Sequence, residues 1–110
     1  MPNVKIFVDE RVWPEVREGI SALLPGLRDM LCSALSVDLA ACQFAVIPVL
    51  ALPDQPRINA ELHILPRPER TPEAVRGAAQ AVRDRIGGAT GQHVAVRIAT
   101  LDPVTYVALK

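Results

Sequence analysis

The order of hydrophobic and polar residues predicts six regular elements along this chain. The first is a strand, because Val4, Ile6 and Val8 alternate with other residues near the start of the sequence. From Pro14 the spacing becomes helical, and the apolar residues of this stretch are Val16, Ile20, Leu23, Leu24, Leu27, Leu31 and Leu35. Proline suits the first turn of such a helix, whereas Pro25 inside it is expected to kink or divide the segment.

The middle of the chain is its most apolar part. Residues 43–52 are rich in valine, isoleucine, leucine and phenylalanine, which predicts a buried strand that continues into a subunit interface. The five residues from Leu52 to Pro56 have the composition of a turn. A two-faced strand follows, and its apolar face consists of Ile58, Ala60, Leu62 and Ile64.

A second helix and a last strand complete the predicted order. Thr71 is expected to cap a helix whose first residue is Pro72 and which ends at Gly87-Gly88. Its inward stripe is predicted to be Val75, Ala79, Val82 and Ile86. Residues 94–98 alternate as a strand, and the tail at 104–109 contains β-forming residues.

The two halves of this βα-ββ-αβ order repeat. At an offset of 58 residues, Pro14-Glu15 matches Pro72-Glu73, and the first strand matches the third. We therefore predict a single α/β (α+β) domain over residues 1–110, with repeat halves at about 2–52 and 57–110. Each half would form a βαβ unit, and the two helices would cover one face of a four-stranded sheet.

Composition and charge exclude several classes of protein. Half of the 110 residues are hydrophobic and 22% are charged, which is unlike a disordered chain. The formal net charge is zero and no basic run occurs, so we expect no nucleic-acid partner. The longest uncharged stretch, Leu39 to Pro53, is too short to span a membrane, and no signal-peptide pattern precedes the first strand. We expect a cytoplasmic protein in which Cys32 and Cys42 are buried, reduced thiols.

The sequence offers no cluster of metal-ligating residues. His63 and His93 have no acidic or cysteine partners at ligand spacing, and no glycine-rich phosphate loop occurs, so we expect neither metal nor cofactor. His63 is instead expected on a polar sheet face, which strand alternation would share with Lys5 and Arg97.

Two segments carry a resemblance to a known superfamily. Met1-Pro2 leads directly into a strand, and the run Leu62–Leu65 is followed by a short loop to Arg70 and by the helix start Thr71-Pro72-Glu73. This arrangement resembles the tautomerase superfamily, in which methionine is removed and proline becomes the amino terminus. Chain length, residues 24–27 and the ending at 101–110 are most similar to 5-carboxymethyl-2-hydroxymuconate isomerase.

The resemblance implies a tautomerase or isomerase that acts without a cofactor on a small enol or keto carboxylic acid. Its catalytic base would be the free amine of Pro2, which apolar surroundings and a nearby cation would keep neutral. Arg70 would bind the substrate carboxylate and stabilise the enolate, with Arg11 as its counterpart in the first half and Arg67 as a neighbour in the same loop. The superfamily also implies a homotrimer whose sheets enclose a central channel.

Some positions depart from this pattern and leave alternatives open. The hydroxymuconate isomerase has a second arginine on the strand after the first helix, where this chain has the uncharged Gln43. Tyr106 is a candidate for the aromatic residue that some members place near the proline. The alternatives are a non-catalytic binding module of ferredoxin-like, ACT-type topology, which has the same element order, and an inactive trimeric member of the superfamily.

Overall fold

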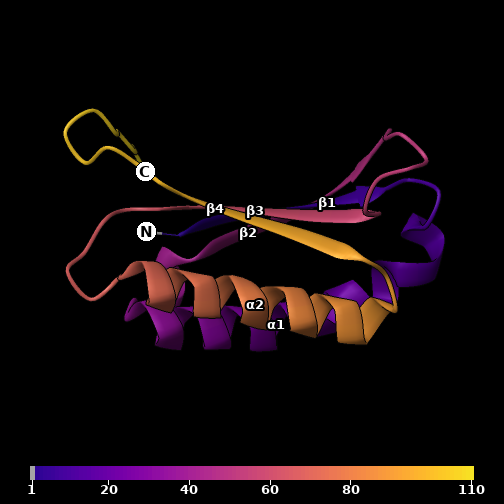
Figure 1. Ribbon diagram of the computed structural model, residues 1–110, viewed down its shortest axis with the longest axis horizontal. Helices are drawn as coiled ribbons and strands as arrows, with labels where there is room; N and C mark the ends of the chain where they lie inside the picture. Colours follow the sequence, from indigo (N-terminus) through magenta and orange to yellow (C-terminus); the bar gives the residue numbers. More distant parts are fainter. Residues whose placement is uncertain (1) are drawn as a thin grey trace.

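The computed structural model describes residues 2–110 and contains the six predicted elements together with one short 3-10 helix (Figure 1). In chain order they are β1 (Asn3–Asp9), α1 (Trp13–Leu35), η1 (Leu39–Ala41), β2 (Gln43–Val49), β3 (Ile58–Ile64), α2 (Pro72–Thr90) and β4 (Val94–Thr100). The predicted βα-ββ-αβ order and fold class are therefore confirmed.

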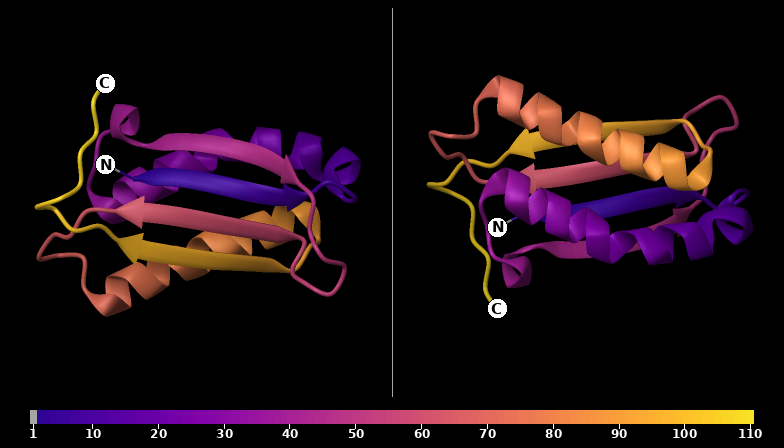
Figure 2. Two further views of the ribbon diagram at one scale, coloured as in Figure 1. Left: turned by 90° about the horizontal axis from the view of Figure 1, so that it is seen from above. Right: turned by 90° about the horizontal axis from the view of Figure 1, so that it is seen from below.

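The four strands form one mixed sheet in the order β2-β1-β3-β4 (Figure 2). β1 is parallel to β2, β3 is parallel to β4, and the central pair β1 and β3 is antiparallel. The two strands of each βαβ unit are thus direct neighbours. A ferredoxin-like fold has a split βαβ unit, so the ferredoxin-like, ACT-type alternative is wrong for this chain.

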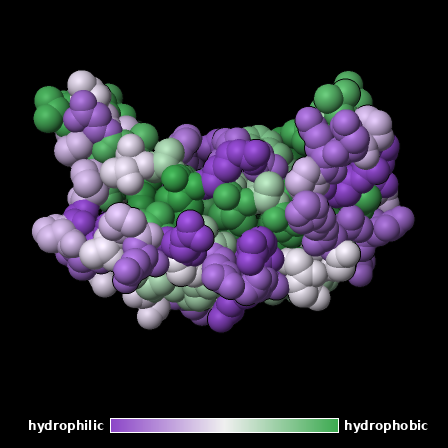
Figure 3. Space-filling view, viewed as in Figure 1, coloured by the Kyte–Doolittle hydropathy of each residue, from purple (hydrophilic) through white to green (hydrophobic). Residues whose placement is uncertain are grey.

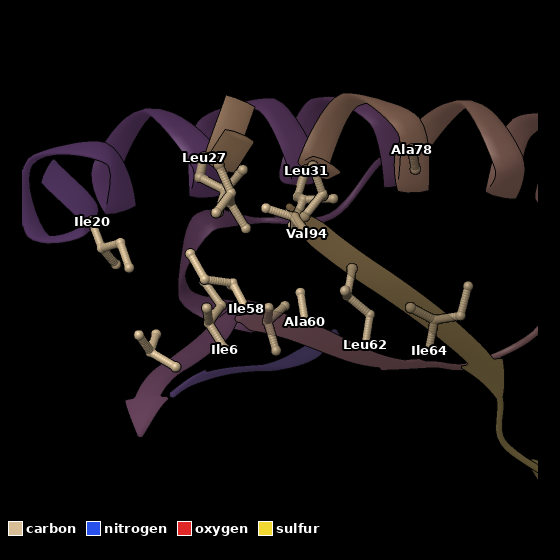
Figure 4. Packing of buried hydrophobic residues seen from close by; sticks show 14 of the residues in the cluster. Ile6, Ile20, Leu27, Leu31, Ile58, Ala60, Leu62, Ile64, Ala78 and Val94 are labelled. Carbon is tan, nitrogen blue, oxygen red and sulfur yellow. The ribbon is translucent and has the colours of Figure 1, made fainter. Parts of the chain in front are cut away.

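Both helices lie on the same face of the sheet, side by side, and the core fills the space between the two layers (Figures 1 and 4). The sheet supplies alternate residues of its strands, as the period of two requires. The labelled core residues in Figure 4 are Ile6, Ile20, Leu27, Leu31, Ile58, Ala60, Leu62, Ile64, Ala78 and Val94. Neither described helix combines the length and the apolar character that crossing a membrane requires.

The other sheet face is open, and polar residues lie on it along β1, β3 and β4. Lys5 pairs with Glu61, and Glu61 pairs with Arg97 across the three strands β1, β3 and β4. Asn59 accepts a hydrogen bond from the Arg97 guanidinium, and His63 is exposed. The predicted placement of His63, Lys5 and Arg97 on one face is confirmed. Because period-two alternation sends the apolar residues toward the helices, these polar residues face solvent in one chain.

Two apolar projections rise beyond the open face, at opposite ends of the sheet (Figures 1 and 3). One is the β2–β3 loop, where Leu50 is 85% exposed and Leu52 is 61% exposed. The other is the tail after β4, which carries Val104, Val107 and Leu109, all highly exposed. The open face therefore lies between two hydrophobic rims, which is unusual for the surface of a monomer.

The prediction that Pro25 divides the first helical segment is wrong. α1 continues through Pro25 as one helix of 23 residues. Apolar residues on both sides of the proline, Ile20 and Leu27 among them, are fully or almost fully buried against the sheet. Packing of this continuous stripe holds the two halves in one helix although proline lacks the amide proton for a helical hydrogen bond.

The predicted end of the second helix is also wrong. Thr71 caps α2 as expected, since its side chain accepts a hydrogen bond from the Ala74 amide, but Gly87-Gly88 lies inside the helix. The left-handed residue that ends α2 is Gly91 (φ 68°), whose N–H donates to the Gly87 carbonyl. Such a conformation favours glycine. The buried stripe contains Ala78 in place of the expected Ala79.

The apolar middle segment is an edge strand, so the prediction of a buried strand there is wrong. β2 ends at Val49, and Gln43 and Ala45 on it are exposed. Within residues 2–110, β1 is the one strand that pairs with it. A long apolar run predicts a buried strand because residues on both of its faces are hydrophobic. The position of β2 at the sheet edge nevertheless leaves one face and one edge of the strand uncovered in a single chain.

One buried carboxylate organises the sheet end opposite to Pro2. Asp9 is 1% exposed and accepts hydrogen bonds from the Arg11 backbone N–H (2.9 Å), from the Arg11 guanidinium (2.6 Å) and from Arg57 (2.8 Å). Hydrogen bonds from Arg11 are the main reason why the pKa of Asp9 lies well below its usual range. The charged form of this side chain therefore stabilises the fold.

We expect Asp9→Asn to lower the melting temperature at pH 7 by about 5–10 °C, because two arginines lose their shared anion. Because the pKa of Asp9 is lower in the folded than in the unfolded state, its charge stabilises the fold fully at pH values above the unfolded-state pKa, which is near 4. This stabilisation decreases below that pH and is lost as the pH falls through the folded-state pKa. The difference between variant and wild type should therefore narrow below about pH 4. Thermal unfolding monitored by circular dichroism checks this, with the exposed Asp54→Asn as control; an equal loss in both variants would contradict it.

Candidate active site

Pro2 lies at the start of β1, where the sheet begins. The residue is buried, and its carbonyl accepts a hydrogen bond from the Gln43 amide at 3.0 Å. This bond ties the start of β1 to the start of the parallel strand β2, beginning the ladder that continues from Asn3 and Gln43. Pro2 is therefore held at a fixed place by backbone pairing rather than left at a frayed terminus.

A small cavity of about 120 Å³ adjoins Pro2. Its other walls are Asn3 and Gln43 at the two strand starts and residues of the C-terminal tail. Figure 2 shows the tail running from the end of β4 past the end of β3 and the start of β1 toward the β2 edge. The tail residues that line the cavity are Tyr106, Ala108, Leu109 and Lys110. Of the residues that the sequence left open, the structure thus brings Gln43 and Tyr106 to Pro2.

Arg70 is fixed by two backbone carbonyls. Its guanidinium donates to the Leu65 carbonyl (2.6 Å), just after β3, and to the Leu35 carbonyl (2.9 Å), at the last residue of α1. The Nε atom is buried and has no hydrogen-bond partner. Burial and the nearby charge of Arg67 lower the pKa of Arg70. A cation at the C-terminus of α1 also interacts favourably with the helix dipole.

Arg70 and Pro2 belong to the same end of the sheet. β3 ends where β1 begins, because Asn3 pairs with His63 in the antiparallel register. The Arg70 guanidinium binds the Leu65 carbonyl just after the end of β3, and the Gln43 N–H donates to the Pro2 carbonyl at the start of β1. The arginine therefore contributes a positive charge to the sheet end at which Pro2 lies, although it does not line the cavity beside Pro2.

Arg11 lies at the opposite end of the same strand. It lies two positions after the end of β1, and its guanidinium binds Asp9 and the Ala51 carbonyl (2.8 Å). The repeat explains this separation, because the antiparallel arrangement of β1 and β3 sends repeat-related residues to opposite sheet ends. Within one chain Arg11 is thus remote from Pro2, and only a second copy could place it there.

Arg67 is a third arginine whose position the structure defines. It donates to the Ser36 carbonyl at 3.2 Å, and its side chain is 45% exposed. Together with Arg70 it fastens the β3–α2 loop to the C-terminal end of α1.

Among residues 2–110, no three histidine, cysteine or acidic side chains come together as a metal site would require.

The comparisons with known proteins place this fold. No protein-family model and no curated protein matches the sequence. A protein of unknown function from Vibrio cholerae is similar in structure, with a TM-score of 0.76, 21% identity, and coverage of 97% of this chain and 83% of that one. A macrophage migration inhibitory factor-like protein from Entamoeba histolytica gives a TM-score of 0.74 at 7% identity, covering 97% and 94%. A fused 4-OT wild-type asymmetric trimer gives 0.71 at 9% identity, covering 96% and 91%.

These likenesses establish the fold over nearly the whole chain. The macrophage migration inhibitory factor-like protein and the 4-OT protein are members of the tautomerase superfamily, so the chain has a tautomerase-like fold. The structure also adds a part of the candidate site that the sequence did not identify, namely the tail residues Ala108, Leu109 and Lys110 beside Pro2. No local pattern could have found them, because the tail forms no helix or strand that would reveal its course.

Proposed function

We propose that this protein is a cofactor-independent tautomerase or isomerase whose general base is the amine of Pro2. The observation that carries the proposal is the position of Pro2, which is buried at the start of β1 beside a small cavity in a tautomerase-like fold. A secondary amine in apolar surroundings is kept partly neutral, because burial disfavours its charged form. Only the neutral amine can accept a proton.

The reaction is an internal proton transfer. The prolyl nitrogen accepts a proton from the enol oxygen of the substrate, and the resulting ammonium returns a proton to the carbon atom. The enol becomes a ketone with no net gain or loss of atoms or electrons. A base whose pKa lies near the working pH transfers protons in both directions, which suits a group that must act as base and then as acid.

The positive charge of Arg70 supports the same chemistry. It opposes protonation of the nearby amine and stabilises the negative charge that develops on the enolate oxygen. Because two carbonyls already occupy its Nη donors, Arg70 would act as a fixed electrostatic group, and binding a substrate carboxylate directly would require it to release one of them. Gln43, which lines the cavity beside Pro2, can donate hydrogen bonds to the substrate.

The substrate class follows from these groups. The cavity is small, Gln43 and Tyr106 in its lining can donate hydrogen bonds, and the Arg70 cation lies at the same end of the sheet, so we propose a small enol or keto acid with one carboxylate. A substrate of 5-carboxymethyl-2-hydroxymuconate isomerase carries more charge, and the uncharged Gln43 favours a monocarboxylate over it. Arg11 enters this proposal only as a contribution from a second copy of the chain.

Removal of Met1 is required, because an amide nitrogen at Pro2 would not be basic. Met1 lies outside the described residues. The intact mass of the protein purified from its own host should correspond to a chain that begins at Pro2. That protein should accelerate the loss of enol absorbance of phenylpyruvate, which has one carboxylate. Quantitative retention of Met1 would end the catalytic proposal and favour an inactive superfamily member.

A homotrimer is the second part of the proposal. Its support is the open sheet face between two apolar rims, and the trimeric state in the name of the 4-OT neighbour. Exposed leucines on the β2–β3 loop and apolar residues of the tail would be covered by neighbouring copies. In a single chain these exposed apolar residues do not contribute to the hydrophobic core, so burial between copies would be their role.

We expect light scattering at micromolar concentration to give a mass near three chains. Replacing Leu50 and Leu52 by Glu should shift the protein to monomers, because six charges would enter the trimer interfaces. Leu39→Glu, at an exposed leucine of η1, is the matched control and should leave the trimer intact. A monomeric wild type, or dissociation in the control alone, would refute this assembly.

A further inference from the structure

Two thiols meet where α1 ends and β2 begins. The sulfur atoms of Cys32 and Cys42 are 2.6 Å apart, about half an ångström beyond the length of a disulfide bond. Cys32 belongs to the last turn of α1, and Cys42 directly precedes β2. Both are free and buried. Ten positions of sequence separate them, so the bond between them would close a short loop that contains η1.

We propose that Cys32 and Cys42 form a redox-responsive dithiol that small disulfides oxidise to an intramolecular disulfide. The inference is independent of the proposed tautomerase activity. Its basis is the proximity of the two sulfur atoms together with an open path to one of them. Reversible pairs of this kind are what a reducing compartment allows, since stable structural disulfides are rare there.

The path is a groove of about 340 Å³ between α1 and the start of β2. Cys42 lines it, and Cys32 does not. The other walls come from the middle of α1 and from Phe44 on β2, and they include the exposed guanidinium of Arg28. Cys42 is thus the thiol that a reagent reaches first, and Arg28 gives the groove a positive charge that suits an anionic reagent.

The chemistry proceeds in two exchanges. The Cys42 thiolate attacks one sulfur of the small disulfide, its S–S bond breaks, and the first thiol leaves. The Cys32 thiolate then attacks the Cys42 sulfur of the mixed disulfide and releases the second thiol. The protein loses two protons and two electrons, and the reagent gains them as two thiols. The second step is favoured because the attacking sulfur is already in contact with its target.

The environment of Cys42 limits the rate. Burial, followed by the hydrogen bond with Cys32, raises the pKa of the Cys42 thiol above its usual range. Only the thiolate reacts, so the rate below that pKa should increase by about tenfold per pH unit. The pair would therefore respond to a sustained change in thiol redox state rather than to a brief pulse of oxidant.

Mass spectrometry of the native protein tests the proposal. Oxidised glutathione should convert the wild type to a species lighter by two hydrogen atoms, and dithiothreitol should reverse this. Cys32 and Cys42 have no lysine or arginine between them, but cleavage before Asp38 separates them, so the linked fragments can be identified. The disulfide should also raise the melting temperature by roughly 10 °C, because the cross-link reduces the conformational entropy of the unfolded chain.

Single variants separate the two roles. Cys32→Ala should accumulate one glutathionyl adduct on Cys42, because nothing resolves the mixed disulfide, whereas Cys42→Ala should stay unmodified under the same exposure. Arg28→Gln should slow oxidation by glutathione disulfide several-fold and leave oxidation by the neutral 2-hydroxyethyl disulfide unchanged. Wild-type protein that remains fully reduced in excess oxidant while folded, or that links only between chains, would overturn the proposal even if a variant failed to fold.

Discussion

Pro2→Ala is expected to reduce kcat for enol ketonisation by about 100-fold or more, while the affinity for a substrate analogue changes little. Alanine leaves a primary amine at nearly the same place, since the backbone bond from Gln43 to the residue 2 carbonyl does not need proline. The variant therefore loses the secondary amine and the ring that fixes the position of its nitrogen. The measurement compares kcat and KM for the enol of phenylpyruvate in variant and wild type.

The control for this variant is Pro53→Ala. Pro53 is exposed in the turn between β2 and β3, at the sheet end opposite to Pro2, and its loss should leave kcat unchanged. Intact mass must show that both variants and the wild type lack Met1, because an amide would mimic the loss of the base. Undiminished activity in Pro2→Ala would show that another group takes the proton, and the tautomerase-like fold would then support a different reaction.

The parts of the fold that the sequence predicted are those that local patterns determine. Alternation identified which side of β3 enters the core, because a strand shows its two faces in every second residue. The cap at Thr71 could be predicted because a threonine side chain accepts a hydrogen bond from an amide of the first helical turn, and because proline suits the first helical position. The helix end was misplaced because any glycine can end a helix, and the left-handed conformation fell at Gly91 rather than at Gly87-Gly88.

Features that depend on which strands are neighbours could not be predicted from the sequence pattern. Alternation assigns faces but not partners, so it could not separate adjacent βαβ units from split ones, nor show that β2 lies at an edge. The same limit applies to the candidate site. Arg11 and Arg70 looked equivalent in the repeat, but antiparallel pairing of β1 and β3 places them at opposite ends of the sheet. The tail residues beside Pro2 arrive there through a course without regular structure.

Arg70→Ala is expected to lower kcat/KM by about 30- to 1000-fold, or 2–4 kcal/mol of transition-state stabilisation. The acid limb of the pH profile should also move to higher pH, because the prolyl amine becomes easier to protonate when the nearby cation is absent. Stability should fall as well, since the end of α1 loses its link to the β3–α2 loop. The measurement is a full pH profile at a temperature at which circular dichroism shows the variant folded.

Two further variants divide the electrostatic role of Arg70 from its structural one. Arg70→Lys keeps the charge but cannot reproduce the fork of two hydrogen bonds, so it should recover the position of the acid limb while part of the stability remains lost. Arg67→Ala removes a cation of the same loop that is 45% exposed, and its effect on the acid limb should be small because solvent screens exposed charges. If Arg70→Ala were less stable but had a normal KM and an unmoved acid limb, the arginine would serve only to hold α1 against the loop, and the base at Pro2 would have to be kept neutral by burial alone.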